Sequence, residues 1–141
     1  MAKVKAKGSL IKTTIATVLT TIAQCTEITI GATTNRTIDV ECLDDSGVGV
    51  EMMNDGAVTQ EPITATILYD PDSTTHQFIT DTIALGAASF PIASSVVFAD
   101  ATPTSATFNA VGFGFGVGIS VKGVLTGNLT IVPAGPVSWP T

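Results

Sequence analysis

The stretch VGFGFGVGIS, residues 111–120, alternates glycine with larger apolar residues. A spacing of two residues is the period of a β-strand, in which successive side chains point to opposite faces of a sheet. We therefore predict a strand or sheet-edge loop with one apolar face and one face almost free of side chains. The alternating residues are Gly112, Phe113, Gly114, Phe115, Gly116, Val117 and Gly118.

These glycines match neither common nucleotide-binding motif. A dinucleotide-binding turn needs glycines at positions i, i+2 and i+5, and the available frames place Val117 or Ile119 at the last position. A P-loop needs Gly-Lys followed by Ser or Thr, whereas Lys122 is followed by Gly123. The stretch is therefore predicted to belong to a sheet and not to a phosphate-binding loop.

The rest of the chain is typical of a mainly β domain, because it is rich in Thr, Val and Ile with turn-forming residues between many runs. A chain of 141 residues is a natural size for one domain, here residues 1–141, and we expect extended segments at about 1–8 and 133–141. The number of strands predicts a β-sandwich or barrel. The predicted strands are 8–18, 22–31, 36–43, 57–69, 89–99, 104–115 and 117–132.

One segment departs from the strand pattern. In DPDSTTHQFITDTIALG, residues 70–86, a proline precedes Asp72 and Ser73, which is typical of a helix start, and Gly86 is a typical stop. We predict a single flanking α-helix at about residues 72–85. Its packed face is predicted to contain Phe78, Ile79, Ile83 and Ala84.

The segment LDDSGVGVEMMNDGA, residues 43–57, has two Asp-rich turns and no clean period. It predicts a long protruding loop or hairpin at about residues 43–56. Adaptable methionine side chains on a protrusion are typical of a partner surface, although the segment could instead fold back on its own domain. The candidate contact residues are Asp44, Asp45, Val48, Val50, Glu51, Met52, Met53 and Asn54.

Charge restricts the possible functions. The formal net charge is −6, and charged residues make up only 13% of the chain. Duplex-binding proteins neutralise phosphates with Lys and Arg, so specific nucleic-acid binding is not expected. The amino end imitates a secretory signal, but Lys12 interrupts its apolar region. No apolar run approaches the ~18 residues of a membrane-spanning helix, so no such segment is expected.

The residue types that most often act as catalysts or metal ligands do not form a recognisable motif in this sequence. His76 is predicted to be a surface or helix-packing residue, and Cys25 and Cys42 are predicted to be buried thiols because they match neither a redox nor a metal-binding motif. An acidic cluster does not have the spacing of a calcium-binding EF-hand loop. We therefore expect no cofactor, no metal and no enzymatic activity. The acidic cluster is Asp44, Asp45, Glu51 and Asp55.

Acidic residues also alternate with apolar residues in TIDVEC, residues 37–42. Asp39 and Glu41 share one face of the predicted strand, and Ile38 and Val40 share the other. In a monomer the acidic face would be an ordinary solvated surface. Repeated around a ring of subunits, the same face would line a channel with carboxylates.

The order of these elements resembles the major tail tube proteins of long-tailed, siphovirus-like bacteriophages, over roughly residues 22–130. The resemblance implies a β-sandwich or barrel flanked by a helix, with no catalytic residues. The similar elements are TIDVECLDD, the glycine-rich excursion closing on NDGAVTQEPITATILYD, the helix after Asp70-Pro71, FPIASSVVF and the closing strand GISVKGVLTGNL.

The resemblance also implies a structural virion protein that assembles in the host cytoplasm into hexameric rings, which stack into the phage tail tube. Its implied partners are other copies of itself, tape measure proteins, and tail terminator or tip proteins. Double-stranded DNA would pass through the tube without specific binding, and an acidic lumen would avoid repeated attraction to it. Asp39 and Glu41 are the candidate lumen residues, with Glu27 on a neighbouring strand as a third.

Two other functions fit the same sequence. A capsid decoration or cement protein is also small, β-rich and without catalytic residues. A secreted β-sandwich binding module would account for the signal-like amino end and the many threonines, but Tyr69 and Trp139 are isolated and offer no clear aromatic platform.

Overall fold

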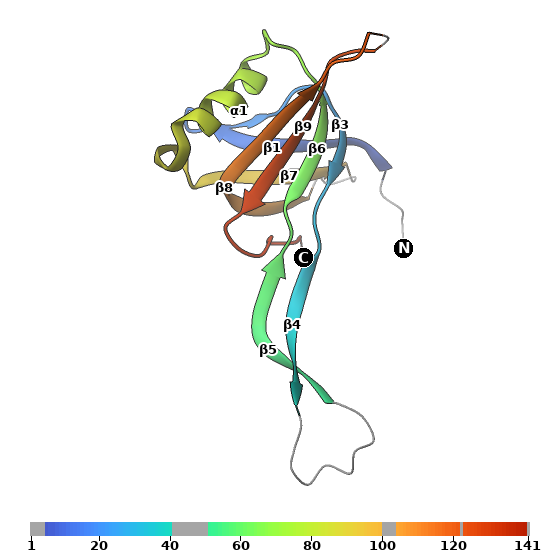
Figure 1. The fold of residues 1–141 in the computed structure, drawn as a ribbon, viewed down its shortest axis with the longest axis vertical. Helices are drawn as coiled ribbons and strands as arrows, with labels where there is room; N and C mark the ends of the chain where they lie inside the picture. The colour runs from blue at the N-terminus through green and yellow to red at the C-terminus, as the bar shows by residue number, and fades with distance from the viewer. Residues whose placement is uncertain (1–4, 41–50, 100–103, 122, 141) are drawn as a thin grey trace.

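The computed structural model describes residues 5–40, 51–99, 104–121 and 123–140, and it is mainly β with one α-helix (Figure 1). This confirms the predicted fold class. Helix α1 (Thr74–Leu85) continues into a short 3-10 helix, η1 (Gly86–Ser89). The strands are β1 (Lys5–Ile15), β2 (Val18–Thr21), β3 (Cys25–Thr29), β4 (Thr33–Val40), β5 (Glu51–Gln60), β6 (Ile63–Leu68), β7 (Ile92–Ala99), β8 (Ser105–Gly118) and β9 (Thr126–Pro133).

Seven strands form one antiparallel sheet in the order β2-β1-β7-β8-β9-β6-β3, and β4 pairs with β5 in a separate hairpin. The sheet is curled, because β1 and β7 run across the direction of β8 and β9, and β1 comes into contact with β3 without pairing to it (Figure 1). The described strands therefore form an open, curled sheet and do not close a barrel.

The hydrophobic core lies inside this curled sheet. Ile11 on β1, Ile67 on β6 and Ile131 on β9 are fully buried and belong to one cluster, although β7 and β8 separate β1 from the paired strands β9 and β6 in the sheet. Ile79 of α1 is also fully buried in this cluster, so the helix completes the core. Burial of such side chains from water is the main force that stabilises the curled arrangement.

The glycine-rich stretch is the second half of β8, the central strand of the sheet. Phe113 meets Phe90 edge to face at 5.3 Å between ring centroids, and Phe115 meets Tyr69 at 5.5 Å, so both phenylalanines pack on the core side. The apolar face is therefore placed as predicted at Phe113 and Phe115, whereas Val117 is exposed. The predicted break at residue 116 is wrong, since β8 runs on to Gly118 and the turn lies at residues 119–125.

Two other predicted strands are each divided in two. The predicted strand 8–18 is interrupted by Ala16 and Thr17, whose φ angles of 49° and 69° form a tight hairpin turn. The predicted strand 57–69 is interrupted at Glu61-Pro62, and β5 and β6 then belong to different sheets. Proline has no N–H to donate to a sheet ladder, which accounts for the second interruption.

The predicted helix is confirmed, with Ser73 at its N-cap and Gly86 at its end, where φ is 63°. The prediction of its packed face is confirmed for Ile79, which is fully buried, and wrong for Ile83 and Ala84, which are exposed. The helix also buries polar side chains, of which Thr75 and His76 form hydrogen bonds with the backbone of Ala23. The buried residues of α1 are Thr75, His76, Ile79 and Thr82.

His76 joins three parts of the chain. Its Nδ1 accepts a hydrogen bond from the backbone N–H of Asp70 at 3.1 Å, so the ring proton lies on Nε2. Nε2 donates to the backbone carbonyl of Ala23 at 2.8 Å. The ring is fully buried and stacks on Tyr69 at 5.9 Å. His76 is thus a helix-packing residue, one of the two predicted possibilities.

Replacing His76 by Phe should therefore destabilise the fold. Phe keeps a planar ring but leaves the half-buried Asp70 N–H and Ala23 carbonyl without this partner, at a cost of about 2 kcal/mol. Urea denaturation followed by circular dichroism measures this change. Thr80→Ala, at an exposed position on the same helix, is the control and should change the free energy of unfolding by less than ~0.5 kcal/mol. Equal stability of the two variants would contradict the role of His76.

Candidate functional site

The outer face of β3, β6, β8 and β9 is built from small and hydroxyl-bearing side chains. The strand register places Gly114, Thr130, Thr64 and Thr29 in one row across the four strands. All residues in this row and in the row beside it are exposed or half-buried. We call this surface the glycine–threonine face, defined by Gly114, Gly116, Thr130, Asn128, Thr64, Thr66, Thr29 and Glu27.

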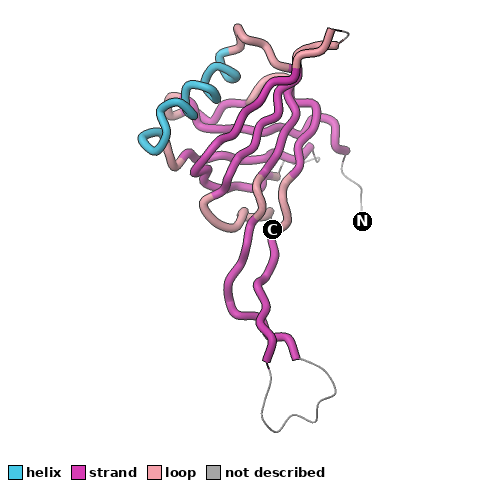
Figure 2. Tube along the Cα trace, in the orientation of Figure 1, coloured by secondary structure: helices cyan, strands magenta, loops and turns pink. Residues whose placement is uncertain are grey.

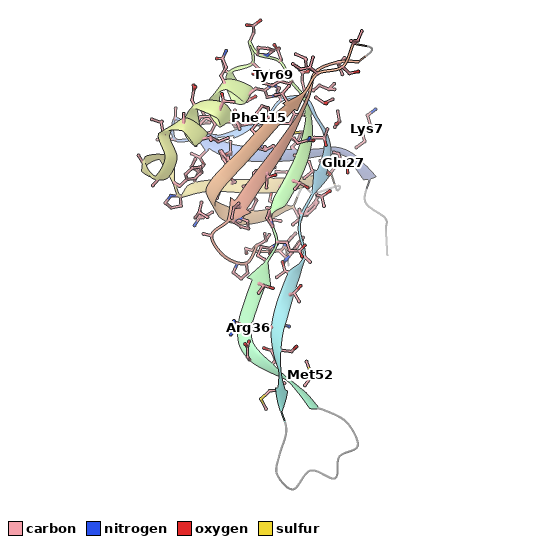
Figure 3. All side chains as sticks on the ribbon, in the orientation of Figure 1. Lys7, Glu27, Arg36, Met52, Tyr69 and Phe115 are labelled. Carbon is pink, nitrogen blue, oxygen red and sulfur yellow. The ribbon has the colours of Figure 1, made fainter. Side chains whose placement is uncertain are left out.

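The glycine–threonine face has almost no charge. Glu27 is the one charged residue in β3, β6, β8 and β9, all of whose residues the structure describes. It is exposed on β3, as Figure 3 shows. A shallow depression of about 270 Å³ lies beside it, lined in part by Thr29, Thr64 and Asn128. Because these four strands contain no Lys or Arg, the face lacks the groups that attract phosphates.

The glycines on this face are not required by packing inside the chain. A Cβ atom added to Gly116 would meet no atom within 4 Å, and one added to Gly114 would make an ordinary 3.6 Å contact with Thr130. Glycine in a strand costs roughly 0.5–1 kcal/mol relative to alanine. Their effect in the described structure is to leave the face smooth.

The β4–β5 hairpin projects away from the sheet (Figure 2). Its register shifts between Asn35 and Thr37, and an ion pair between Arg36 and Asp55 crosses the hairpin at this point. The side chain of Asn54 accepts the backbone N–H of Gly56 at 2.7 Å, which supports the positive φ of 85° at that glycine. These local contacts set the bend of the hairpin.

The observed hairpin confirms the prediction of a protrusion, but its strands β4 (residues 33–40) and β5 (residues 51–60) reach beyond the predicted bounds on both sides. Met52 and Met53 are 60% and 55% exposed. They do not fold back onto the sheet, so they remain available to another molecule. Figure 3 shows Met52 far from the labelled residues of the sheet.

Gln60 fixes the base of the hairpin. Its Nε2 donates to the backbone carbonyl of Gly31 at 2.8 Å, and its Oε1 accepts the backbone N–H of Val137 at 3.2 Å. Trp139 adds a second link, because its Nε1 donates to Oγ1 of Thr33 at 3.2 Å. Sequence reasoning missed these links, since they join residues far apart in the chain.

The carboxyl-terminal segment is thus held by its own subunit. Ser138 pairs with Thr107 of β8 through two backbone hydrogen bonds of 2.8 and 3.0 Å, and Val137 is buried. The observed anchor is the sheet and the hairpin base of the same chain.

Both edges of the seven-stranded sheet are unpaired in the described structure, at β2 and at β3. An open groove of about 700 Å³ lies between the first half of β1 and β3, with Val96 and Phe98 among its lining residues. Cys25 also lines the groove, and burial raises the pKa of its thiol to about 11. Cys25 is therefore protonated at neutral pH and is a poor nucleophile.

The structure separates the residues that were expected to line one acidic surface. Glu27 lies on the glycine–threonine face, whereas Asp39 lies on the hairpin, where it pairs with Met52. The expectation that their strands are neighbours is wrong, because β3 pairs with β6 and β4 pairs with β5. Several expected residues lie outside the described residues, namely Glu41, Cys42, Asp44, Asp45, Val48 and Val50.

The described residues lack two kinds of feature, metal-binding clusters and membrane-spanning helices. No group of three or more His, Cys, Asp or Glu side chains among them could hold a metal ion. Asp55 of the predicted acidic cluster is engaged by Arg36. No helix in this part of the chain has both the length and the apolar character needed to cross a membrane.

Two solved structures of gene transfer agent particles contain a chain with this architecture. No family model and no curated protein matches the chain. A solved structure of the tail of an empty gene transfer agent particle, with C6 symmetry, matches with a TM-score of 0.73 and 21% identity. The virion of a native gene transfer agent particle matches with a TM-score of 0.70 and 21% identity. Both matches cover 97% of this chain and 98% of the other.

The predicted resemblance to tail proteins is thus confirmed at the level of the fold. The likeness extends over nearly the full length of both chains, so it includes the projecting hairpin as well as the sheet. The chain has the fold found in the tail of a gene transfer agent particle.

Replacing glycine by alanine should affect stability differently on the glycine–threonine face and at the base of the hairpin. Gly116→Ala should leave stability unchanged or raise it by up to ~1 kcal/mol, because the added Cβ is unobstructed. Gly31→Ala should destabilise by about 1–3 kcal/mol, because its Cβ would lie 2.5 Å from the backbone oxygen of Pro62. Urea denaturation midpoints test both changes. A stability loss at Gly116 as large as that at Gly31 would show that the glycine–threonine face is packed.

Proposed function

We propose that the chain is the major tail tube subunit of a phage-like particle, forming hexameric rings that stack into a tube through which DNA passes. The observation that carries the proposal is the match to a C6-symmetric tail, at a TM-score of 0.73 over 97% of this chain. The protein would be located in the virion tail after assembly in the host cytoplasm. Tape measure, tail terminator and tip proteins are its proposed partners besides further copies.

The open sheet edges support closure into a ring. β2 and β3 each present an edge with unpaired backbone groups in the described structure. Such edges favour uncontrolled pairing between molecules unless they are covered. A closed ring of identical subunits covers every edge by the same contact. The groove beside β3, which opens between β1 and β3, offers additional surface for a neighbouring subunit.

We propose the glycine–threonine face and the carboxylates Glu27, Asp39 and Glu41 as the surfaces that meet DNA. The face is smooth, hydroxyl-rich and free of basic residues. Every Lys or Arg on a lumen surface would be repeated in each subunit and would attract phosphates along the whole tube. A neutral or acidic lining lets a polyanion move without these attractive contacts.

The projecting hairpin is proposed to contact the next ring. Its exposed methionines are flexible and polarizable, which suits a contact surface. The full proposed contact set includes residues outside the described part of the chain, and it consists of Asp44, Asp45, Val48, Val50, Glu51, Met52, Met53 and Asn54.

Electron microscopy of the purified protein tests the assembly. We expect rings with six-fold symmetry and stacked tubes. A capsid decoration protein would bind shells and form no tubes, and a secreted binding module would stay monomeric. Either of these outcomes would contradict the proposed function.

Charge reversal tests the two proposed lumen surfaces separately. Glu27→Lys places a base on the glycine–threonine face, and Asp39→Lys combined with Glu41→Lys places two bases on the hairpin. A variant that changes the true lumen should assemble into tubes but deliver DNA at least ~10-fold less efficiently at low salt, because each ring repeats the new attraction. The neutral variant Glu27→Gln is the control for loss of the carboxylate alone. Normal DNA delivery by both charge-reversed particles would contradict the proposal that these carboxylates line the lumen.

A further inference from the structure

The turn between β8 and β9 ends in three exposed aliphatic side chains. Ile119 is 82% exposed, Val121 is fully exposed and Val124 is 64% exposed. We call these three residues the apolar tip. Tight turns and loops usually carry Gly, Asn, Asp, Ser or Pro, whose side chains suit water or the turn geometry. Three aliphatic residues at the end of a projecting turn are therefore unusual.

The fold of the chain itself does not require the apolar tip. The turn is held by backbone contacts, with the N–H of Gly123 bonded to the carbonyl of Ser120 and the N–H of Tyr69 bonded to the carbonyl of Leu125. The core cluster includes no residue of the tip. Exposed apolar clusters that do not support the fold commonly mark an interaction surface.

The apolar tip lies at the opposite end of the molecule from the hairpin. Figure 1 shows the β8–β9 turn at one end of the longest axis, with strands β4 and β5 extending from the sheet in the opposite direction. Met52 and Met53 provide a second exposed apolar surface near the hairpin end. When unlike ends of one molecule are complementary, the contact can repeat from copy to copy without limit.

Charge in the sequence favours the same pairing of ends. Residues 119–125 contain one charged residue, a lysine. Residues 43–54 contain three acids and no base, so this segment of the sequence and the turn have charges of opposite sign. The acids are Asp44, Asp45 and Glu51. Opposite charge assists encounter and orientation between two surfaces.

We infer that the apolar tip of one copy docks against Met52 and Met53 on the hairpin of a second copy. This inference rests on the proposed tube and names the surface that receives the hairpin of the adjacent ring. Unbranched methionine side chains can adapt to the branched side chains of Ile119, Val121 and Val124. A lipid bilayer could also receive an apolar tip, but it would leave the opposite charges and the exposed methionines without a role.

The double variant Ile119→Asp with Val121→Asp tests the docking. It places two charges in the proposed contact without touching the core, so the subunit should fold and form rings. The fraction of protein in tubes, measured by sedimentation and electron microscopy, should fall at least ~10-fold, since buried unpaired charges oppose the contact. Leu85→Asp, at a 67% exposed position of α1, is the matched control and should form normal tubes.

The outcomes separate this inference from the proposed function. If the wild-type protein forms neither rings nor tubes, the proposed function fails. If the wild-type protein and the double variant form tubes equally well, the docking inference alone fails. Wild-type protein that binds phosphatidylglycerol vesicles through the tip, with tubes unaffected by the double variant, would also overturn the docking and identify a lipid surface as the occupant.

Crosslinking provides a test that does not depend on a disruptive variant. A photoreactive benzophenone residue at position 121 is introduced into one isotopically labelled population and mixed with unlabelled protein during tube assembly. We expect mass spectrometry to identify crosslinks to the peptide that contains Met52 and Met53 of another copy. Crosslinks that map reproducibly to another surface, or only within one copy, would overturn the inference.

Discussion

The division of β8 into two unlike faces is the constraint on which the rest of the structure depends. Phe113 and Phe115 pack toward the core, while the glycines between them leave the other side of the same strand without side chains. Because β8 is the central strand, its neighbours on one side continue the smooth surface and those on the other side carry the sheet around the core. One alternating sequence therefore serves stability on one face and leaves the other face free for function.

Surfaces of different chemical character also lie at different positions along the length of the molecule. The hairpin carries exposed methionines and many of the acids, the sheet between the two ends presents hydroxyl groups, and the β8–β9 turn is aliphatic. A monomer gains nothing from this arrangement, since it leaves apolar side chains in water at two distant places. The proposed assembly, in which unlike ends meet, would cover the apolar side chains at both ends.

The parts of the fold with local signals could be predicted from the sequence. The glycine alternation indicated a strand, Ser73 and Gly86 bounded the helix, and the Asp-rich turns indicated a protrusion. The turn at Ala16-Thr17 was missed because neither residue is typical of a tight hairpin turn. The polar buried face of α1 was missed because it depends on Ala23, which lies far from the helix in sequence. Glu27 and Asp39 are separated because β3 and β4 belong to different sheets. The order of strands along a sequence does not specify which strands pair.

The links at the base of the hairpin can form only late in biosynthesis. The contact of Val137 with Gln60 spans 77 residues, and that of Trp139 with Thr33 spans 106. A ribosome therefore exposes the whole hairpin well before the residues that fasten its base have been made. Until Trp139 emerges, the hairpin is joined to the sheet through its two connecting segments without this clamp. A nascent chain thus presents the hairpin before its base is fastened, and a chain synthesised through Trp139 can form both links.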